Sequence, residues 1–165
     1  MNEDLELMMH VYKGAEMGVY TTTNLINALK KKENKIKHVL EMELKEYEHY
    51  MKQTQNILLK NNVEPKNSNP MAKIGSDFGI AFETMKDNSD PAIAQMLIEG
   101  FTMGSVDMTA KIKNYKSTSS KEYLQIAQNY LKFHENEIEK LKTFMWVNVF
   151  NLYIFFFYNV LYYNI

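Results

Sequence analysis

The chain has 165 residues, with 19 basic and 20 acidic side chains and a formal net charge of −1. All of the basic residues are Lys, and the sequence contains neither Arg nor Cys. The absence of Cys excludes disulfide scaffolds, zinc ribbons and cysteine nucleophiles. Balanced charge without Arg argues against a nucleic-acid-binding protein, which usually presents a basic surface. Six Gly and three Pro beside 12 Met indicate a helical chain with few turns.

Apolar residues recur every three or four positions in the first third of the chain, which places them on one face of a helix. The first such row consists of Leu5, Met8, Tyr12, Ala15, Val19, Thr22, Ile26 and Leu29. The second consists of Ile36, Leu40, Glu43, Tyr47, Tyr50, Thr54 and Ile57. These rows predict helices over about 2–31 and 34–61, which are antiparallel because the hinge between them is short.

Two Pro residues mark the starts of further helices. In Asn69-Pro70 and Asp90-Pro91 an N-cap residue precedes a Pro suited to the first turn, which predicts a short helix over about 70–86 and a longer one over 91–116. After a polar turn at 116–120, a last row consists of Leu124, Ala127, Leu131, His134, Ile138, Leu141 and Met145. The sequence therefore predicts an all-α, antiparallel four-helix bundle. Its two up-down pairs are joined by a long crossover that contains a short helix.

The six glycines form three pairs, each spaced four residues apart. They are Gly14 and Gly18, Gly75 and Gly79, and Gly100 and Gly104. Each pair lies on one face of a predicted helix, where the missing side chains let a neighbouring group come close. Tight packing inside the bundle is one interpretation, and a subunit interface that makes the chain a homo-oligomer, most simply a dimer, is the other. The Met residues are expected to be flexible core filler.

Several ionisable residues interrupt the apolar rows or flank them. They are Glu16 in the first helix, Glu43 in the second, Glu99 in the 91–116 helix, and His134 with Glu137 in the last. Such side chains are costly in a helix seam unless they are paired or bind metal, so we expect all of them, Glu99 included, to be covered. His10 and His38 are expected on the surface without a role.

The second helix also contains Glu46 and His49, which form a literal Glu-x-x-His sequence. Their level along the helix axis would place them opposite Glu16. The helical period instead turns His49 away from the apolar stripe and turns Glu43 into it. The level along the axis therefore selects Glu46 and His49, whereas the helical period selects Glu43. If Glu46 and His49 are not ligands, they belong to a solvated charged face.

The helix order, the long crossover and the positions of these acids resemble the ferritin-like superfamily. Segments such as VYKGAEMGVYTTTNL and MLIEGFTMGSVDMTAKIKNYK look closest to a branch of small bacterial proteins of the Firmicutes type. The resemblance covers about 3–144. It implies one Glu on the first helix, Glu-x-x-His on the second, one Glu on the third and Glu-x-x-His on the fourth, together holding iron or manganese. The matching residues are Glu16, Glu46 with His49, and Glu99, whereas the last helix carries His134 and Glu137 in reverse order, with Leu131 where Glu is expected.

Two functions stay open at this point. The first is a structural or interaction module with a degenerate metal site, whose acids pair with Lys, Tyr or His. The second is a di-iron or di-manganese protein with oxidase, peroxide-linked or metal-handling activity. Its candidate ligands are Glu16, Glu43, Glu46, His49, Glu99, His134 and Glu137. The sequence predicts no catalytic residue, organic cofactor or nucleic-acid partner.

The last 21 residues, 145–165, form a tail that differs from the bundle domain at 1–144. The tail has no charged residue and holds nine of the 21 aromatic residues of the chain. As a helix it would extend about 31 Å, enough to cross a bilayer core, although three Asn interrupt it and its composition favours strands. Three interpretations of this tail stay open: a read-through or frameshifted end, a membrane anchor, or an extra packed helix. The acidic N-terminus is unlike a secretory signal, so the expected location is the cytoplasm, or the membrane through 145–165 alone.

Overall fold

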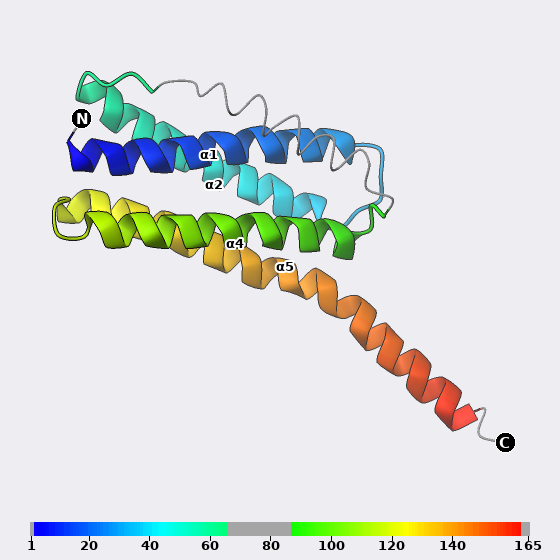
Figure 1. Ribbon diagram of the computed structural model, residues 1–165. Coiled ribbons are helices and arrows are strands. Elements are labelled where there is room, and N and C mark those ends of the chain that lie inside the picture. The colour runs from blue at the N-terminus through cyan, green and yellow to red at the C-terminus, as the bar shows by residue number, and fades with distance from the viewer. Residues whose placement is uncertain (1, 66–86, 163–165) are drawn as a thin grey trace.

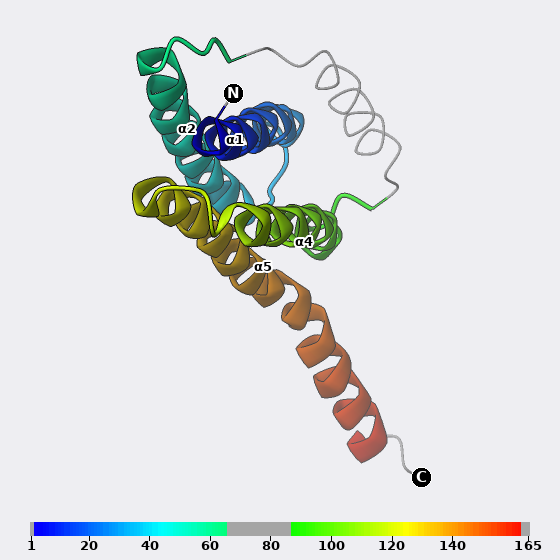
Figure 2. The same ribbon diagram turned by 60° about the vertical axis from the view of Figure 1, so that its left-hand side comes forward.

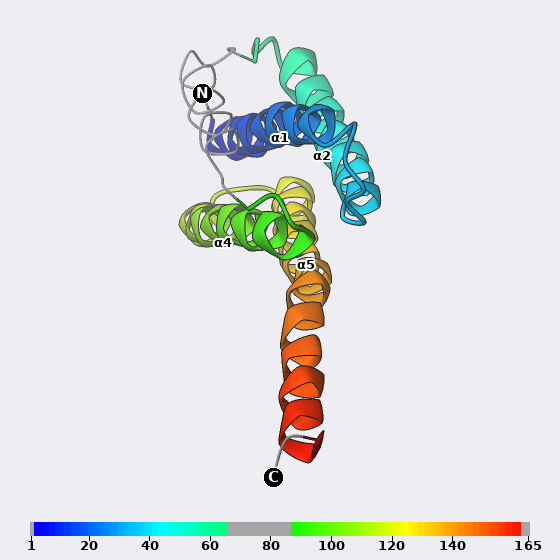
Figure 3. The ribbon, with the colours of Figure 1, turned by 90° about the vertical axis from the view of Figure 1, so that its right-hand side faces the viewer.

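A computed structural model of the chain describes residues 2–65 and 87–162, with side chains up to residue 145. The described residues contain four helices, α1 (Glu3–Ala28), α2 (Lys37–Lys60), α4 (Asp90–Tyr115) and α5 (Lys121–Tyr162), shown in Figure 1. Helix α1 packs against α2, and α4 packs against α5. The two antiparallel pairs lie one above the other, as Figure 3 shows. The predicted all-α four-helix bundle is confirmed.

Helices α2 and α4 run in the same direction, as Figure 1 shows, and 29 residues separate the end of α2 from the start of α4. The predicted helix at 70–86 and the glycine pair at 75 and 79 lie outside the described residues.

Local capping explains where α1 begins, and the helix ends three residues earlier than predicted. The Asn2 side chain accepts a hydrogen bond from the Leu5 amide at 2.9 Å, which satisfies one of the free N–H groups of the first turn. The helix ends at Ala28, so the Lys residues at 30–32 lie beyond its last turn.

Asp90 is not the N-cap of α4, which is a correction to the sequence prediction. Ser89 has that position, and Asp90 lies in the first turn before Pro91. Its carboxylate instead accepts hydrogen bonds from the Asn34 side chain and from the Lys35 amide, both at 2.9 Å. Asp90 therefore fastens the α1–α2 loop to the start of α4, a long-range role that a capping pattern cannot reveal.

Replacing Asp90 with Ala is expected to lower the free energy of unfolding by about 2 kcal/mol, because two hydrogen bonds to a charged acceptor are lost. Asp90→Asn keeps one side-chain oxygen as an acceptor and should lose less. Urea denaturation of the wild type and the two variants measures the difference. Equal stability of D90A and the wild type would contradict the role given to this side chain.

The apolar rows form the core between the two helix pairs, and an aromatic cluster occupies its middle. This cluster comprises Tyr47, Tyr50, Phe101, Tyr130, Phe133 and His134. Neighbouring ring centroids lie between 4.4 and 6.5 Å apart. Rings at these separations pack edge to face or offset and hold one another in place. The cluster therefore gives the centre of the bundle little freedom to rearrange.

The tail continues α5 as a helix to Tyr162 and leaves the bundle, as Figures 1 and 2 show. The strand preference of its composition is overruled because extending a formed helix adds one hydrogen bond per residue without a new nucleation step. The side chains of 146–165 lie outside the described residues. In the part of the chain that the structure describes, no helix is both long and apolar enough to span a membrane.

Candidate functional site between α1 and α4

Three of the seven sequence-predicted ligands lie in the interior. Glu43 of α2 is 0% exposed, and His134 and Glu137 of α5 are 5% and 2% exposed. Their positions on the inner faces of the two helices follow from the helical spacing of the apolar rows. Glu16 of α1 is half-buried, and its Oε1 atom accepts a hydrogen bond from the Tyr12 hydroxyl at 3.1 Å.

The other three candidates, Glu46, His49 and Glu99, are exposed. Within α2 the helical-face criterion is therefore right, and the criterion of level along the axis is wrong. The expectation that Glu99 is covered is also wrong. Its carboxylate lies on the solvent side of α4, where the Gln95 amide approaches it at 3.3 Å. Met103 and Val106, which lie four and seven residues after Glu99 on the same face of α4, are exposed as well.

Glu43, Tyr130 and His134 are the unusual feature of the interior. Several of their polar atoms lack a hydrogen-bond partner among the described residues. These atoms are both carboxylate oxygens of Glu43, both ring nitrogens of His134 and the Tyr130 hydroxyl. Buried polar atoms in proteins are nearly always paired, so three such side chains together need an explanation. Sequence analysis missed Tyr130, although its position four residues before His134 on the same helix face would have indicated it.

Burial sets the protonation of this centre. Burial, and after it the nearby Glu137 carboxylate, raise the pKa of Glu43 to about 8, and Lys140 opposes the shift. Burial lowers the pKa of His134 to about 4. Burial also raises the pKa of Glu137, against a hydrogen bond from Lys140 Nζ at 2.6 Å. At neutral pH the centre therefore contains a mostly protonated Glu43 and a neutral His134.

A groove of about 460 Å³ lies between α1 and α4, and the polar centre forms part of its floor. Glu43, Tyr47, Tyr130 and His134 all line it. Apolar residues from α1 and α4 form most of the remaining surface, and Met103, 75% exposed, is among them. The side chains that carry the unpartnered polar atoms thus lie along a space between the two helices, and the polar atoms themselves are covered.

Polar contacts hold α1 and α4 together on either side of this groove. His10 of α1 and Asp107 of α4 meet at 2.6 Å, and the Tyr115 hydroxyl donates to Glu6 at 3.0 Å. Near the other end of α1, the Asp90 side chain accepts a hydrogen bond from Asn34 in the loop that follows α1. The expectation that His10 has no role is corrected, because its ring joins α1 to α4 through a residue 97 positions away in sequence.

The glycine pairs explain how the floor is built. A Cβ atom at Gly14 would lie 2.9 Å from the Tyr130 hydroxyl, at Gly18 2.3 Å from the Tyr47 ring, and at Gly104 2.7 Å from the His134 ring. These glycines therefore let three rings lie directly against the helix backbones. At Gly100 an added Cβ would meet nothing within 4 Å. Packing within the bundle accounts for three of the four described glycines, and Gly100 borders the open groove.

The Met residues also divide between the packed core and the groove. Met8, Met9 and Met108 are buried and act as core filler, as predicted. Met17, Met96 and Met103 line the groove, as the buried Met108 also does, and Met17 and Met103 are exposed. The filler interpretation therefore holds for only part of this set.

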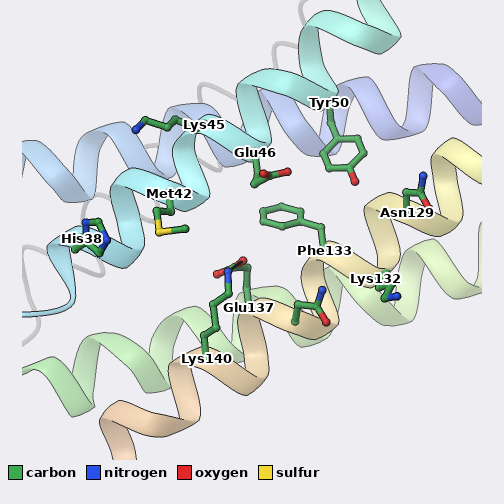
Figure 4. Close-up of a pocket in the computed structure, with 11 residues that line it drawn as sticks. His38, Met42, Lys45, Glu46, Tyr50, Asn129, Lys132, Phe133, Glu137 and Lys140 are labelled. Atoms are coloured by element: carbon green, nitrogen blue, oxygen red, sulfur yellow. Dashed lines mark hydrogen bonds and ion pairs between the residues drawn. The ribbon is translucent and has the colours of Figure 1, made fainter.

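A second cleft, of about 640 Å³, lies between α2 and α5 and differs in character. In Figure 4, Glu46 and Tyr50 from α2 point toward Phe133 of α5, and Glu137 meets Lys140. Three Lys side chains, at positions 45, 132 and 140, line this cleft, and so does His38. Its carboxylates therefore have Lys side chains close by, and one of these, Lys140, also lowers the pKa of Glu43, which lines the groove on the other side of the bundle.

The arrangement does not form a metal centre of the kind that the resemblance implies. Over residues 2–65 and 87–162, no three His, Asp or Glu side chains come together closely enough to hold a metal ion. The centre offers hydrogen-bond acceptors and donors to a molecule in the groove. No protein-family model, curated protein or solved structure matches the chain. The fold is thus a four-helix bundle without an assigned family.

Proposed function

We propose that the chain is an interaction module of a specific kind, a helical bundle that binds a small molecule in the α1–α4 groove. The observation that carries the proposal is Glu43, which is fully buried, has both carboxylate oxygens unpartnered and lines this groove. A buried polar group without a partner costs about 1–3 kcal/mol, and a ligand that pairs with it removes this cost.

The size and lining of the groove support this function. Small-molecule sites usually have volumes of roughly 300–1,000 Å³ and are mostly apolar, with a few converging polar groups. The volume of about 460 Å³ lies within this range, and the lining is apolar apart from a few side chains such as Glu43 and His134. Flexible thioether side chains such as Met17 and Met103 can adapt to the shape of a ligand.

The di-iron or di-manganese alternative has less support. In the pattern of the resembled superfamily, Glu46, His49 and Glu99 supply ligands from α2 and α4, and all three are exposed here. The acids that are buried as whole side chains, Glu43 and Glu137, come from only two helices, and Glu16 of α1, whose Oε1 accepts from Tyr12, adds one covered oxygen. A buried site that bridges two metal ions needs carboxylates from more helices than these.

Filling the groove tests the proposal. Gly100→Leu places a branched side chain where an added Cβ has free space, so the variant should fold and lose ligand binding by at least about tenfold. Ala110→Leu, at an exposed position of the same helix, is the control and should keep binding. Saturation-transfer NMR of a mixture of neutral and charged fragments with the full chain measures binding.

Metal analysis of protein purified without chelator completes the test. Iron or manganese well below one equivalent per chain agrees with the proposal. Stoichiometric metal that is lost in E43Q would overturn it in favour of the metal-binding alternative. Equal fragment binding by wild type and G100L would also overturn it, because the ligand would then lie elsewhere.

A further inference from the structure

The floor of the groove holds both donors and acceptors, and the acceptors outnumber the donors once Glu43 is ionised, because only the His134 N–H and the Tyr130 O–H then donate. Glu43 has two unpartnered oxygens, the neutral imidazole of His134 has one nitrogen lone pair, and the Tyr130 oxygen can also accept. A group with several N–H donors would satisfy them together. An ammonium group has three donors and no acceptor, so its hydrogen-bonding pattern is complementary to this floor.

Two acidic side chains among the described residues line the groove: Asp107, which meets the His10 ring at 2.6 Å, and Glu43, which becomes negative when it ionises. The described lining includes none of the 19 Lys of the chain. Three aromatic residues, Tyr47, Phe101 and Tyr130, also line the groove. Aromatic faces attract cations within about 6 Å, and the attraction is stronger where water is excluded. The lining is therefore complementary to a positive group.

We infer that the ligand of this groove is a protonated primary amine carried on an apolar body, with its ammonium group against Glu43 and its body along the Met-lined wall. The inference rests on the proposed function and specifies its ligand class. An anionic amphiphile such as a carboxylate is disfavoured once Glu43 is ionised, because its charge would then lie near Glu43 and Asp107 with no Lys in the described lining.

Proton release is a consequence of this assignment. Several titratable or charged groups face Glu43 or share its groove, and these are Tyr47 of α2, Tyr130, His134, Glu137 and Lys140 of α5, His10 of α1 and Asp107 of α4. Glu43 holds a proton at neutral pH, and an ammonium group binds best to its carboxylate. Binding near pH 7 therefore releases a proton, and affinity should rise with pH up to the pKa of about 8.

Three probes with one phenyl body separate the possible ligand classes. Isothermal titration calorimetry of the full chain compares 2-phenylethylamine, neutral 2-phenylethanol and anionic phenylacetate at pH 7. We expect the amine to bind at least about tenfold more tightly than the alcohol and phenylacetate to bind most weakly. Titrations in two buffers of different ionisation enthalpy should show the release of close to one proton with the amine and none with the alcohol.

Matched variants identify the carboxylate. Glu43→Gln removes the charge without changing the shape and should abolish both the preference for the amine and the proton release. Glu41→Gln removes an exposed carboxylate from the same helix and should change neither. The buffer comparison needs only the wild type, so the inference is tested even where E43Q does not fold.

Failure of the inference can be told apart from failure of the proposed function. Equal binding of amine and alcohol, lost in G100L, keeps the groove as the binding site and overturns the amine assignment. Tightest binding of phenylacetate also overturns the assignment. Tight amine binding that persists in both G100L and E43Q overturns the groove itself.

Discussion

Replacing Gly18 with Ala is expected to destabilise the bundle by about 2–3 kcal/mol, whereas Gly100→Ala should leave stability unchanged or raise it by up to about 1 kcal/mol. Both glycines lie inside helices, so the gain in helix propensity is the same for each. The difference comes from packing. A Cβ atom at position 18 would lie 2.3 Å from the Tyr47 ring, and one at position 100 would meet nothing within 4 Å.

The Tyr47 ring has little room to move away from the new methyl group. It stacks on Phe101 at a centroid distance of 5.9 Å and meets the edges of Phe133 and His134 at 5.0 and 6.0 Å. Moving it would disturb the aromatic cluster at the centre of both helix pairs. The penalty therefore exceeds the gain from placing Ala in a helix.

Chemical denaturation of the wild type, G18A and G100A measures the two effects, and a double-mutant cycle identifies their origin. In a Tyr47→Leu background, the smaller side chain should reduce the penalty of G18A, which gives a coupling energy of about 1 kcal/mol or more. Similar stability changes in G18A and G100A would show that close contact with Tyr47 is not the reason for Gly18.

The fold could be predicted from the sequence because local periodicity and capping define it. The rows around Leu40 and Leu141 show which faces are buried, and both of these side chains are fully buried in the structure. The error at Asp90 has a different source. Its neighbours in sequence make it a plausible cap, but its hydrogen-bond partners are 55 and 56 residues away. Such partners depend on how the two helix pairs dock, which local spacing does not encode.

The candidate site could be predicted only in part, for a similar reason. The period of α2 correctly placed Glu43 inside, because the direction of a side chain is a property of one helix. The groove depends on which face of α1 meets α4, and two polar contacts and several glycines from separate segments determine this. Glu99 shows the limit most clearly. An apolar neighbourhood in sequence did not mean burial, because α4 turns that residue to the solvent.

The stability of the protein is expected to fall by about 2 kcal/mol between pH 6.5 and pH 8, and Glu43→Gln should remove most of this fall. The pKa of Glu43 rises from 4.5 to about 8 on folding, mainly because of burial and then because of Glu137. The folded protein therefore binds this proton more tightly than the unfolded chain does. The resulting stabilisation is fully present below pH 4.5 and is lost as the pH rises through about 8.

His134 acts in the opposite direction at lower pH. Burial lowers its pKa from 6.5 to about 4, so the unfolded chain takes up a proton that the folded protein refuses. This contribution to stability is present above pH 6.5 and is lost as the pH falls toward 4. Between pH 4.5 and 6.5 the slopes from Glu43 and His134 oppose each other, and the stability curve should be nearly flat there. The raised pKa of Glu137 adds to the loss at higher pH.

Urea denaturation at a series of pH values tests this curve, with Glu41→Gln as the control because it removes an exposed carboxylate from the same helix. E41Q should follow the wild type. E43Q should lose the decline above pH 6.5 and retain the decline at acid pH that comes from His134. A decline above pH 6.5 that is as steep in E43Q as in the wild type would mean that Glu43 is already ionised in the folded protein. In that case the interior would hold a compensating cation beside it, and amine binding near pH 7 would release no proton. The stability curve of the free protein therefore bears directly on the proton release expected on ligand binding.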